Sequence, residues 1–294
     1  MIVAGAAAGV KVGRMRVSRI GALSAEVSVG DLTVFALSDG QTVMPATHLR
    51  APDGAPLADA DMINADLSDG KLRLQVSAFA VRGPDGCMLI DTGAADAWHP
   101  TLGLLPQAMA EAGIAAEDIS VVALTHTHVD HISGLTAPDG APTFPKARVF
   151  VPEAELALFR AEARMAAVLG QMVLMQPGKA LMPGVVAIAA PGHEVGHTAF
   201  LVAGRLLIWG DVIHHPAIQF ARPEVTWAFD TDPGLARDTR LSLMARAAAK
   251  GWTVAGAHLA FPGIGRISIA GAGYAFDPVM LDAEPNLNGT LAVR

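Results

Sequence analysis

The sequence predicts one α/β domain built from layered sheets. Apolar runs typical of strands mix with helical segments, in the order strands, helix, strand, helix, strands, helix, strand. No linker and no convincing internal repeat divides the 294 residues, and an apolar fraction of 52% is enough to bury a large core. We therefore expect a single domain over residues 31–294, preceded by an N-terminal extension over residues 1–30.

The beginning of the chain predicts little regular structure. Residues 1–30 are expected to form a weakly structured tail. Leu32–Leu37 predicts a strand that ends at the turn signal Ser38-Asp39-Gly40. Residues 41–72 are rich in Pro, Asp and Ala with scattered apolar residues, a composition typical of a functional loop. Residues 41–70 are therefore a candidate lid over a site.

A hairpin, a helix and a buried strand follow. Leu74–Val81 and Cys87–Ile90 flank Gly83-Pro84-Asp85-Gly86, which predicts a β-hairpin. Residues 101–113 predict a helix that stops at Gly113. The apolar run Val121-Val122-Ala123-Leu124 predicts a buried strand.

The second half alternates strands with helices. Proline at the first turn and Gly170 at the end predict a helix over Pro152–Leu169. In the same way, Asp232-Pro233 and Gly251 predict a helix over Asp232–Gly251. The expected strands are Ala147–Val151, Val185–Ala190, Ala199–Val202, Arg205–Trp209 and Thr253–Ala257.

Composition excludes several classes of function. The formal net charge is −7 and no basic run is present, so nucleic acid is not an expected partner. Cys87 is the only cysteine, which rules out an internal disulfide and a thiolate zinc cage; inside an apolar run, its expected role is packing. No stretch approaches about 18 uninterrupted apolar residues, so no membrane-spanning helix is expected.

The N-terminus fits a signal peptide poorly, because Met1–Val10 has no basic segment ahead of its short apolar run. A cytoplasmic location is therefore expected. Export is the alternative, because Ala22-Leu23-Ser24-Ala25 resembles a cleavage site. The expected partner is a small-molecule substrate, and a homodimer is the default assembly.

The densest chemical signal is His126-Thr127-His128-Val129-Asp130-His131, directly after the apolar run at 121–124. The cluster should lie where that buried strand leaves its sheet. In an extended segment, alternation sends His126, His128 and Asp130 to one side, and a tight turn can bring His131 back beside them. Imidazole and carboxylate together suit zinc and similar first-row metals. The alternative is a polar surface loop, but four such groups packed together would need an ion to be stable.

Four further segments place an acid or an imidazole at the end of a predicted strand. One such residue is usually structural, whereas four in order after the dense cluster form a joint signal for a single site. The segments are Ile90-Asp91-Thr92-Gly93, Pro191-Gly192-His193-Glu194-Val195-Gly196-His197, Trp209-Gly210-Asp211 and Gly256-Ala257-His258. In the second of them, either His193 or His197 could be the ligand.

This series resembles the metallo-β-lactamase superfamily, with its HxHxDH motif followed by His, Asp and His. The resemblance covers nearly all of residues 32–276. It implies an αββα sandwich with a binuclear metal site at one edge of the sheets, and a bridging carboxylate, Asp211. The implied ligands are His126, His128 and His193 for one metal, and Asp130, His131 and His258 for the other.

The resemblance also implies roles behind the ligands. The family pattern favours His193 over His197 as the ligand, which leaves His197 to support the ligands from outside. Asp91 matches the family's Asp-Thr-Gly turn, where a carboxylate is expected to orient ligand histidines. The alternative for Asp91 is a turn cap.

The C-terminal half resembles one branch of the superfamily, that of methyl parathion hydrolase with its lactonase and arylesterase relatives. This resemblance implies hydrolysis of a neutral, apolar ester, lactone or phosphotriester, with a lactone or carboxylic ester as the expected natural substrate. It rests on Gly210-Asp211-Val212-Ile213-His214, Ala217-Ile218-Gln219-Phe220, Phe229-Asp230-Thr231-Asp232 and His258-Leu259-Ala260-Phe261-Pro262-Gly263-Ile264-Gly265.

Such a site could use a hydroxide shared by two divalent ions about 3.5–4 Å apart. Zinc is the expected metal, although manganese, iron and cobalt accept the same ligands. Asp130 is a candidate proton acceptor. His214 is a candidate donor to the substrate oxygen or leaving group, with a packed histidine bonded to the backbone as the alternative. Trp98 and Phe220 are candidate pocket walls, and for each the alternative is a place in the core.

Three rival functions fit similar residues. A thioester hydrolase of the glyoxalase II type would need a basic patch for an anionic thiol carrier, which a net charge of −7 does not suggest. A mononuclear iron dioxygenase on the same fold would hold one iron instead of two zinc-like ions. A metal-binding protein without catalysis is disfavoured by the intact Asp211.

Overall fold

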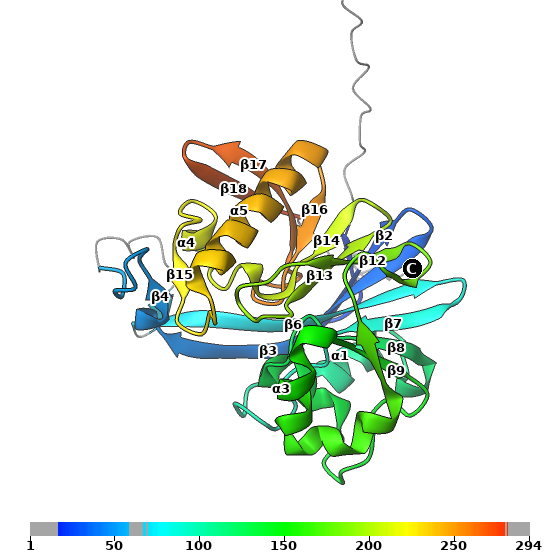
Figure 1. The fold of residues 1–294 in the computed structure, drawn as a ribbon. Helices are drawn as coiled ribbons and strands as arrows, with labels where there is room; N and C mark the ends of the chain where they lie inside the picture. The colour runs from blue at the N-terminus through cyan, green and yellow to red at the C-terminus, as the bar shows by residue number, and fades with distance from the viewer. Residues whose placement is uncertain (1–16, 59–66, 69, 280, 282–294) are drawn as a thin grey trace, which may run out of the picture.

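The computed structural model describes residues 17–58, 67–68, 70–279 and 281. Within them the strands form two large mixed sheets and one small pair (Figure 1). The first sheet contains β1 (Val17–Arg19), β2 (Ser24–Val29), β3 (Leu32–Pro45), β5 (Leu67–Ser68), β6 (Lys71–Gly83), β7 (Gly86–Ile90), β8 (Ile119–Ala123), β9 (Arg148–Pro152) and β10 (Met172–Met175). The second contains β11 (Ala180–Met182), β12 (Val185–Ala189), β13 (Thr198–Val202), β14 (Leu206–Ile208), β16 (Thr253–Ala255), β17 (Ile264–Ala270) and β18 (Gly273–Pro278). The small pair joins β4 (Leu49–Arg50) to β15 (Thr226–Trp227).

Helices cover the outer faces of the two sheets. The α-helices are α1 (Leu105–Glu111), α2 (Val129–Ile132), α3 (Leu156–Ala161), α4 (Pro216–Gln219) and α5 (Pro233–Lys250). Short 3₁₀ helices are η1 (Ala46–His48), η3 (Ala116–Asp118), η4 (Ser133–Leu135), η5 (Glu153–Glu155), η6 (Ala163–Gln171) and η7 (Gly210–Val212). In Figure 1, α1 and α3 lie outside the first sheet, whereas α5 lies outside the second.

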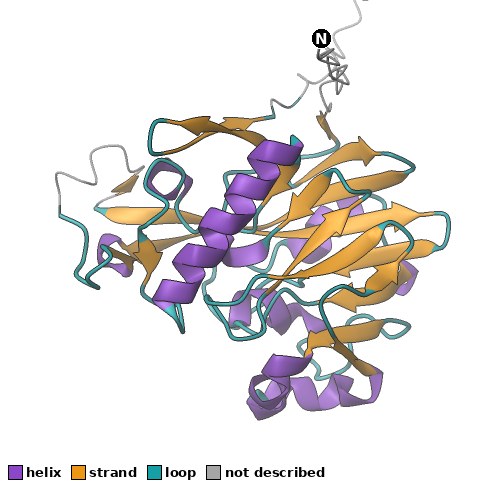
Figure 2. Cartoon of the chain, turned by 45° about the horizontal axis from the view of Figure 1, so that its top comes forward, coloured by secondary structure: helices purple, strands orange, loops and turns teal. Residues whose placement is uncertain are grey.

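Three buried clusters show why the layers stack in this order. The central one joins apolar residues of the two sheets, such as Val34 and Phe79 of the first and Phe200 and Ile208 of the second. A second cluster packs α1 and α3 against the outer face of the first sheet. A third packs α5 against the second sheet, and Figure 2 shows this longest helix lying across the strands. The architecture is therefore an αββα sandwich.

Helix α5 and the β6–β7 hairpin form as their local sequence predicts. The Asp232 carboxylate accepts a hydrogen bond from the Leu235 amide, Pro233 opens the helix, and Gly251 ends it in the left-handed conformation at φ 64°. In the hairpin, Gly83 pairs with Gly86. Cys87 of β7 is buried in the outer core of the first sheet, as its predicted packing role requires.

The predicted tail over residues 1–30 is wrong for residues 17–29, which form β1 and β2 at one edge of the first sheet. Strand β2 alternates with a period of two: Ala25, Val27 and Val29 are buried in the core between the sheets, and Ser28 is exposed. Residues 1–16 of the predicted extension lie outside the described residues.

Strand β3 also differs from the expectation, because it continues past the predicted turn at Ser38-Asp39-Gly40 to Pro45. The pairing register with β6 shifts between Ser38 and Gly40, and Gly40 has a φ of 120°. The glycine therefore makes a β-bulge instead of a turn. Residues 41–45 of the predicted lid therefore belong to β3, and Leu49–Arg50 form β4. Residues 59–66 and 69 lie outside the described residues.

Two predicted helices are shorter or broken. The helix expected over residues 101–113 spans only Leu105–Glu111. The helix expected over Pro152–Leu169 is divided into η5, α3 and η6, because Glu162 adopts an extended backbone conformation between α3 and η6. Strands β10, β11, β17 and β18 were not anticipated.

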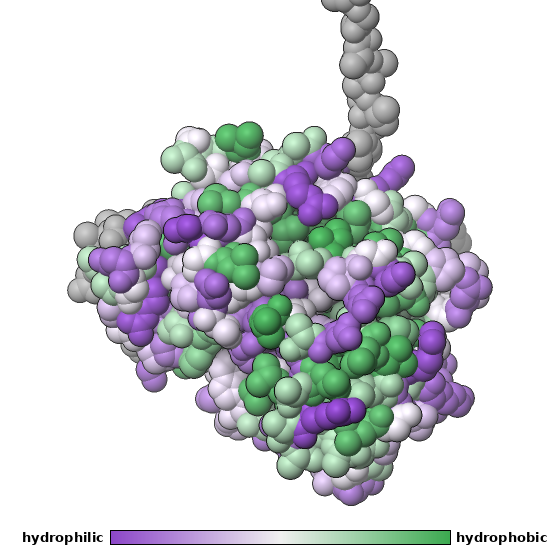
Figure 3. Space-filling view, in the orientation of Figure 1, coloured by the Kyte–Doolittle hydropathy of each residue, from purple (hydrophilic) through white to green (hydrophobic). Residues whose placement is uncertain are grey.

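No helix in the described part of the chain is long and apolar enough to cross a membrane. Apolar side chains nevertheless reach the surface among hydrophilic ones (Figure 3), as is usual for folded proteins. Exposed examples include Leu158 of α3 and Leu174 of β10.

Candidate metal centre

The first sheet contributes its residues at the carboxyl ends of neighbouring parallel strands. Strand β7 runs parallel to β8, and β8 runs parallel to β9. Asp91 directly follows β7, and Thr125 and His126 follow β8. The ends of such strands meet at one edge of a sheet, which is where ligands commonly bind in α/β proteins.

The dense cluster leaves β8 differently from the predicted extended alternation. His128 is the N-cap of α2, so Asp130 and His131 lie in the first turn of that short helix. Helical geometry therefore turns them toward the site, and no extended run reaches residue 130. Asp130 and His131 are both buried.

The second sheet contributes one residue at each of three strand ends. Strand β12 is antiparallel to β13, β13 is antiparallel to β14, and β14 is parallel to β16. Strands β12, β14 and β16 therefore point the same way, and His193, Asp211 and His258 follow their carboxyl ends. All three side chains are buried.

A glycine lets the His193 turn pack against α5. Gly192 has a φ of 128°, and a Cβ there would lie 2.1 Å from the backbone nitrogen of Ala236. The Asp232 amide donates to the Gly192 carbonyl, and the Thr231 amide donates to the His193 carbonyl. Only glycine fits this approach, so the N-terminus of α5 holds the turn in place.

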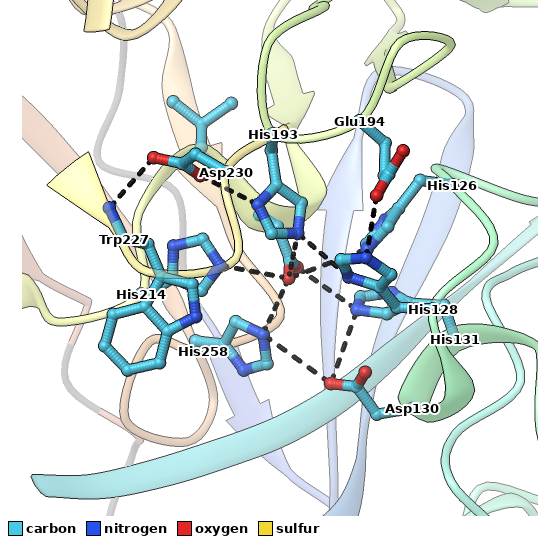
Figure 4. Close-up of polar contacts among 12 residues, drawn as sticks. His126, His128, Asp130, His131, His193, Glu194, His214, Trp227, Asp230 and His258 are labelled. Carbon is cyan, nitrogen blue, oxygen red and sulfur yellow. Dashed lines mark hydrogen bonds and ion pairs between the residues drawn. The ribbon is translucent and has the colours of Figure 1, made fainter. Parts of the chain in front are cut away.

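The histidine rings converge on one centre (Figure 4), and the distances place the Asp211 carboxylate there. The Nε2 atom of His258 lies 2.9 Å from Asp211 Oδ2, and that of His131 lies 3.2 Å from Oδ1. The Nε2 atoms of His193 and His126 lie 3.4 and 3.8 Å from Oδ2. His128 presents Nδ1 instead, 3.1 Å from His193 Nε2.

The other ring nitrogen of each of these histidines faces a hydrogen-bond acceptor. His193 Nδ1 donates to Asp230 Oδ1 at 2.9 Å, and His131 Nδ1 donates to Asp91 Oδ2 at 2.8 Å. The remaining acceptors are Glu194 Oε1 for His128 Nε2, the Gln75 carbonyl for His258 Nδ1, and Thr125 Oγ1 for His126 Nδ1. Since Thr125 Oγ1 donates its own proton to Asp91, it can only accept from His126.

These outer acceptors decide what the inner nitrogens can do. An imidazole that donates from its outer nitrogen leaves a lone pair on its inner nitrogen, which is the tautomer that binds a metal ion. The inner atoms of His126 and His131, and Asp211 Oδ1, are buried and make no hydrogen bond among the described residues beyond their ion-pair contacts inside the cluster, at 3.2 to 3.8 Å. Buried polar atoms normally have partners, and a cation would supply the missing one here.

The cluster offers enough donor atoms for two ions. One group contains His126, His128, His193 and Asp211, and another contains Asp130, His131 and His258. Within each group the candidate ligand atoms lie within 4.8 Å of one another. Nitrogen and carboxylate donors of this kind fit zinc and neighbouring first-row metals, so the residues present fit a binuclear site.

The electrostatics also favour cations. Burial lowers the pKa of His193 to about 3, which leaves its ring neutral. Burial raises the pKa of the Asp130 carboxyl, but the His131 ring outweighs this effect and brings that pKa to about 2. As for His193, burial lowers the pKa of the His131 ring, but the Asp211 and Asp130 carboxylates outweigh burial and raise that pKa well above its usual value. Bound metal ions would replace the proton that this site otherwise draws to His131.

His193 and His197 are clearly distinguished by their contacts. His197 Nδ1 donates to the Ala190 carbonyl at 2.9 Å, and its Nε2 accepts from the Asp211 amide at 3.1 Å. Both nitrogens are therefore occupied by backbone groups, and the ring fixes the turn that carries Asp211. His193, in contrast, directs Nε2 into the cluster, and the predicted division of roles stays a prediction.

His214 lies inside the cluster as well. Its Nε2 atom is 3.3 Å from Asp211 Oδ2, and its ring stacks between Trp227 and His258. Its amide donates to Gln219 Oε1, but neither ring nitrogen has a hydrogen-bond partner among the described residues. The alternative of a ring bonded to the backbone is therefore not observed. Burial lowers its pKa to about 3, so the ring is neutral at pH 7.

A cavity of about 320 Å³ opens onto the cluster. Trp98 lines it, together with Met44 from the part of the predicted lid that forms β3. The full lining is Met44, Leu74, Trp98, Thr127, His128, Val129, Asp130, His193, Asp211, His214, Trp227, Phe229 and His258.

Phe220, the other predicted pocket wall, does not line this cavity. It is buried in the outer core of the second sheet, where its ring stacks on Phe276 with centroids 4.8 Å apart and also packs near Trp209. At the end of α4, it faces the sheet and not the metal cluster. The alternative of a core position is therefore the correct one.

Several contributors to the site were not assigned from the sequence. Asp230 orients His193, and its other oxygen accepts from the Trp227 amide. The buried guanidinium of Arg240, on α5, lies 3.9 Å from Asp230 and donates to the Val212 and Val225 carbonyls. Asp230 lies in Phe229-Asp230-Thr231-Asp232, one of the segments that carry the family resemblance, so a sequence signal for it was present. No sequence signal marks the Gln75 carbonyl.

Comparisons with known proteins agree with this architecture. The sequence model described as the metallo-beta-lactamase superfamily matches residues 72–258. An N-acyl homoserine lactonase from Bacillus cereus is 24% identical over an alignment of 173 residues that covers 51% of this chain and 68% of the lactonase.

Solved structures resemble nearly the whole chain. The hydrolase AbOPH of the beta lactamase superfamily is 27% identical with a TM-score of 0.77, over 90% of this chain and 99% of AbOPH. AidC, a dizinc quorum-quenching lactonase in complex with its product N-hexanoyl-L-homoserine, is 21% identical with a TM-score of 0.80. That match covers 92% of this chain and 99% of AidC, and it shows a shared fold.

The predicted αββα sandwich is confirmed by these matches and by the arrangement of the layers. The family match spans the dense histidine cluster, both other histidines predicted as ligands, and Asp211, the predicted bridging aspartate. The chain therefore belongs to the metallo-beta-lactamase superfamily.

Proposed function

We propose that this protein is a hydrolase that uses two metal ions to open a lactone or a carboxylic ester. The observation that carries the proposal is the orientation of five histidines. Each donates outward to an acceptor and directs its other nitrogen toward the Asp211 carboxylate or its neighbours. This arrangement has a clear chemical use only if cations occupy the centre.

The residues would divide between the ions as follows. His126, His128 and His193 would hold one ion, and Asp130, His131 and His258 the other, with Asp211 between the two groups. When bound, two such ions supply a water nucleophile at neutral pH and polarise the oxygen of the substrate. Zinc is the expected metal.

The side chains around the cluster would complete the chemistry. Asp130 is ionised and lines the cavity, where it can accept a proton from a nucleophilic water. His214 is neutral, and its Nε2 faces the cluster, so it can donate a hydrogen bond to a substrate oxygen. The stack between Trp227 and His258 holds that ring in one orientation.

The cavity supports a neutral substrate. Its described lining includes the apolar side chains Met44, Leu74, Val129 and Phe229, and neither lysine nor arginine. An anionic thiol carrier would find no cationic partner there, which disfavours the thioester alternative. The similarity to an N-acyl homoserine lactonase supports a lactone, and phosphotriester turnover is proposed as a side activity.

The test is a substrate panel on metal-quantified protein. We expect about two zinc-like ions per chain and the highest kcat/KM on lactones or aryl esters. Chelation should abolish turnover, and zinc should restore it. One iron per chain without hydrolysis would contradict the proposal, and a clear preference for thioesters would replace it with the glyoxalase II alternative.

A further inference from the structure

One arginine of α5 is buried beside the half of the candidate metal centre that the second sheet supplies. Arg240 is 1% exposed and is among the largest fully buried side chains of the described residues. Its helix packs on the outer face of the second sheet (Figure 2). A guanidinium keeps its charge, so burying it is costly unless its donors are bonded. Its contacts therefore identify the groups that it holds.

The guanidinium bonds three backbone carbonyls from two segments of the chain. Its Nε atom donates to the Val212 carbonyl at 2.7 Å. Its Nη1 atom donates to the Pro223 and Val225 carbonyls at 3.0 and 2.7 Å. Val212 ends η7, directly after Asp211 and two residues before His214. One rigid planar group thus ties the turn that carries these two side chains to the loop ahead of β15.

A fourth contact reaches Asp230. The Nη2 atom of Arg240 lies 3.9 Å from Asp230 Oδ2, which is too far for a hydrogen bond but close enough for attraction between opposite charges. The Asp230 side chain is fully buried, and its Oδ1 accepts from His193 Nδ1 at 2.9 Å (Figure 4). The guanidinium therefore lies directly behind the carboxylate that orients His193.

Gln219 joins the same network at the Val225 carbonyl. Its Oε1 atom accepts from the His214 and His215 amides, at 2.8 and 2.9 Å. Its Nε2 atom donates to the Val225 carbonyl at 3.1 Å. That carbonyl therefore accepts from both Gln219 and Arg240. Together the two side chains fix the main chain around His214.

We propose that Arg240 is a positioning residue of the metal centre. It does not line the cavity over the cluster. It acts on Asp211 through the Val212 carbonyl and on His193 through Asp230. The inference rests on the proposed function, because it requires that the cluster bind metal ions. The alternative is that Arg240 only attaches α5 to the second sheet.

Removal of the guanidinium tests this role. Arg240→Met deletes the charge and all five donors but keeps a long, unbranched side chain that suits a helix. The Val212 and Pro223 carbonyls lose this donor, so the Asp211 turn and Asp230 lose their common support.

Arg237→Met is the matched control. Arg237 lies three residues earlier on α5, and its guanidinium donates at the surface to Asp238. The control therefore makes the same chemical change on the same helix, away from the network around Arg240.

The main readout is metal affinity, measured on the full chain by competition between zinc-loaded protein and a chelator. Arg240→Met should weaken binding of one of the two ions by about 10- to 100-fold, the usual result when groups behind the ligands are removed. In cobalt-loaded protein the visible absorption bands should shift, because His193 and Asp211 change position. Arg237→Met should match the wild type in both measurements.

Arg240→Lys keeps the test valid if Arg240→Met does not fold. An ammonium group retains the charge beside Asp230 but lacks the rigid fork that reaches three carbonyls at once. We expect a cooperative urea transition, which shows a folded protein, and an affinity for one ion that is weaker by about three- to tenfold.

Kinetics separate this inference from the proposed hydrolysis. With 4-nitrophenyl acetate at saturating zinc, Arg240→Met should lower kcat by about tenfold and leave KM within about twofold, because the residue does not touch the substrate. If no variant hydrolyses any ester but Arg240→Met still weakens metal binding, the positioning role stands and only the hydrolase assignment fails.

Two outcomes would overturn the positioning role. Wild-type metal affinity and cobalt bands in every folded Arg240 variant, with a lower urea midpoint, would show that Arg240 only attaches α5 to the sheet. Equal loss of affinity in Arg237→Met would show that α5 responds to any such change. In both cases retained turnover would leave the hydrolase assignment intact.

Discussion

The two sheets build their halves of the candidate metal centre in different ways. The first sheet supplies His126, His128, Asp130 and His131 from one six-residue segment at the end of β8. The second supplies His193, Asp211 and His258 from three separate strand ends. In the first half the chain itself keeps the ligands together. In the second half strand order and the packing of α5 do so.

The outer partners follow the same division. Asp91 and Thr125, which support His131 and His126, lie at the ends of adjacent parallel strands. Asp230, which supports His193, belongs to a loop held by the Trp227 amide and flanked by Arg240 of α5. The half from the first sheet, which one segment of the chain supplies, is thus supported by the sheet edge. The half from the second sheet, which is assembled from three strand ends, is supported by a loop and a helix packed against it.

Substitution of Asp211, where the two halves meet, should have the largest effect. Asp211→Asn removes the one carboxylate among the described residues that faces candidate ligands of both groups. We expect loss of one metal ion per chain and a decrease in kcat/KM of roughly 10³-fold, which corresponds to several kcal/mol of charge stabilisation. Metal analysis and kinetics on the same sample measure this, and two retained ions with full turnover would exclude a bridging role.

Substitution of His214 tests a residue in the half that the second sheet supplies. In our assignment, His214 itself binds no metal ion. His214→Phe keeps an aromatic ring between Trp227 and His258 but removes both nitrogens. Turnover should fall by about 10²-fold, within the usual range for a group that donates to the reacting atoms. Metal content should stay at the wild-type level, and unchanged kinetics would reduce His214 to a packing role.

The outer carboxylates compare the two halves directly. Asp230→Asn should weaken binding of the ion held by His193, and Asp91→Asn that of the ion held by His131, each by roughly 10- to 100-fold. In each case an amide nitrogen can replace the acceptor and favour the wrong tautomer of the histidine. Competition with a chelator measures the affinities.

Asp232→Asn is the matched control for these variants. Asparagine caps a helix about as well as aspartate, so α5 and the metal affinity should be unaffected. Equal loss of affinity in Asp232→Asn and Asp230→Asn would show that the region as a whole, and not the acceptor on His193, determines binding.

The smallest expected effect concerns pH and His197. Burial lowers its pKa to about 4, against 6.5 in the unfolded chain, so below pH 6.5 the unfolded state binds more protons. Stability from this group is therefore present above pH 6.5 and is lost as pH falls toward 4. Between pH 7 and 5 the loss should be about 2 kcal/mol.

His197→Gln should remove that part of the pH dependence, because glutamine does not titrate and can still accept from the Asp211 amide. Denaturant unfolding of metal-free wild type and variant at pH 7, 6 and 5 measures the difference. Parallel stability profiles for the two proteins would show that the His197 ring does not remain neutral in the folded state.

The sequence predicted the two halves of the site unequally. The dense segment His126–His131 was recognisable by itself, whereas His193, Asp211 and His258 became significant only as an ordered series. The choice between His193 and His197 needed the family pattern, and the structure supports it with the two backbone bonds of His197. Their roles as ligands remain predictions.

The errors also have physical causes. Strand β2 was missed although Ala25, Val27 and Val29 alternate, because an alternation over only six residues gives a weak signal. Phe220 was assigned to the pocket because an apolar residue near a site does not show which way it faces. Trp98 was assigned on the same evidence and does line the cavity.

The sequence by itself determined the donor types, their order and the reaction class that they allow, because ligand chemistry resides in side chains and their spacing. Only the tertiary structure decided which ring nitrogen of each histidine faces inward, since that depends on acceptors such as Asp230 and the Gln75 carbonyl that lie far away in the chain. Such contacts arise from the packing of distant segments, and no local pattern of residues encodes them.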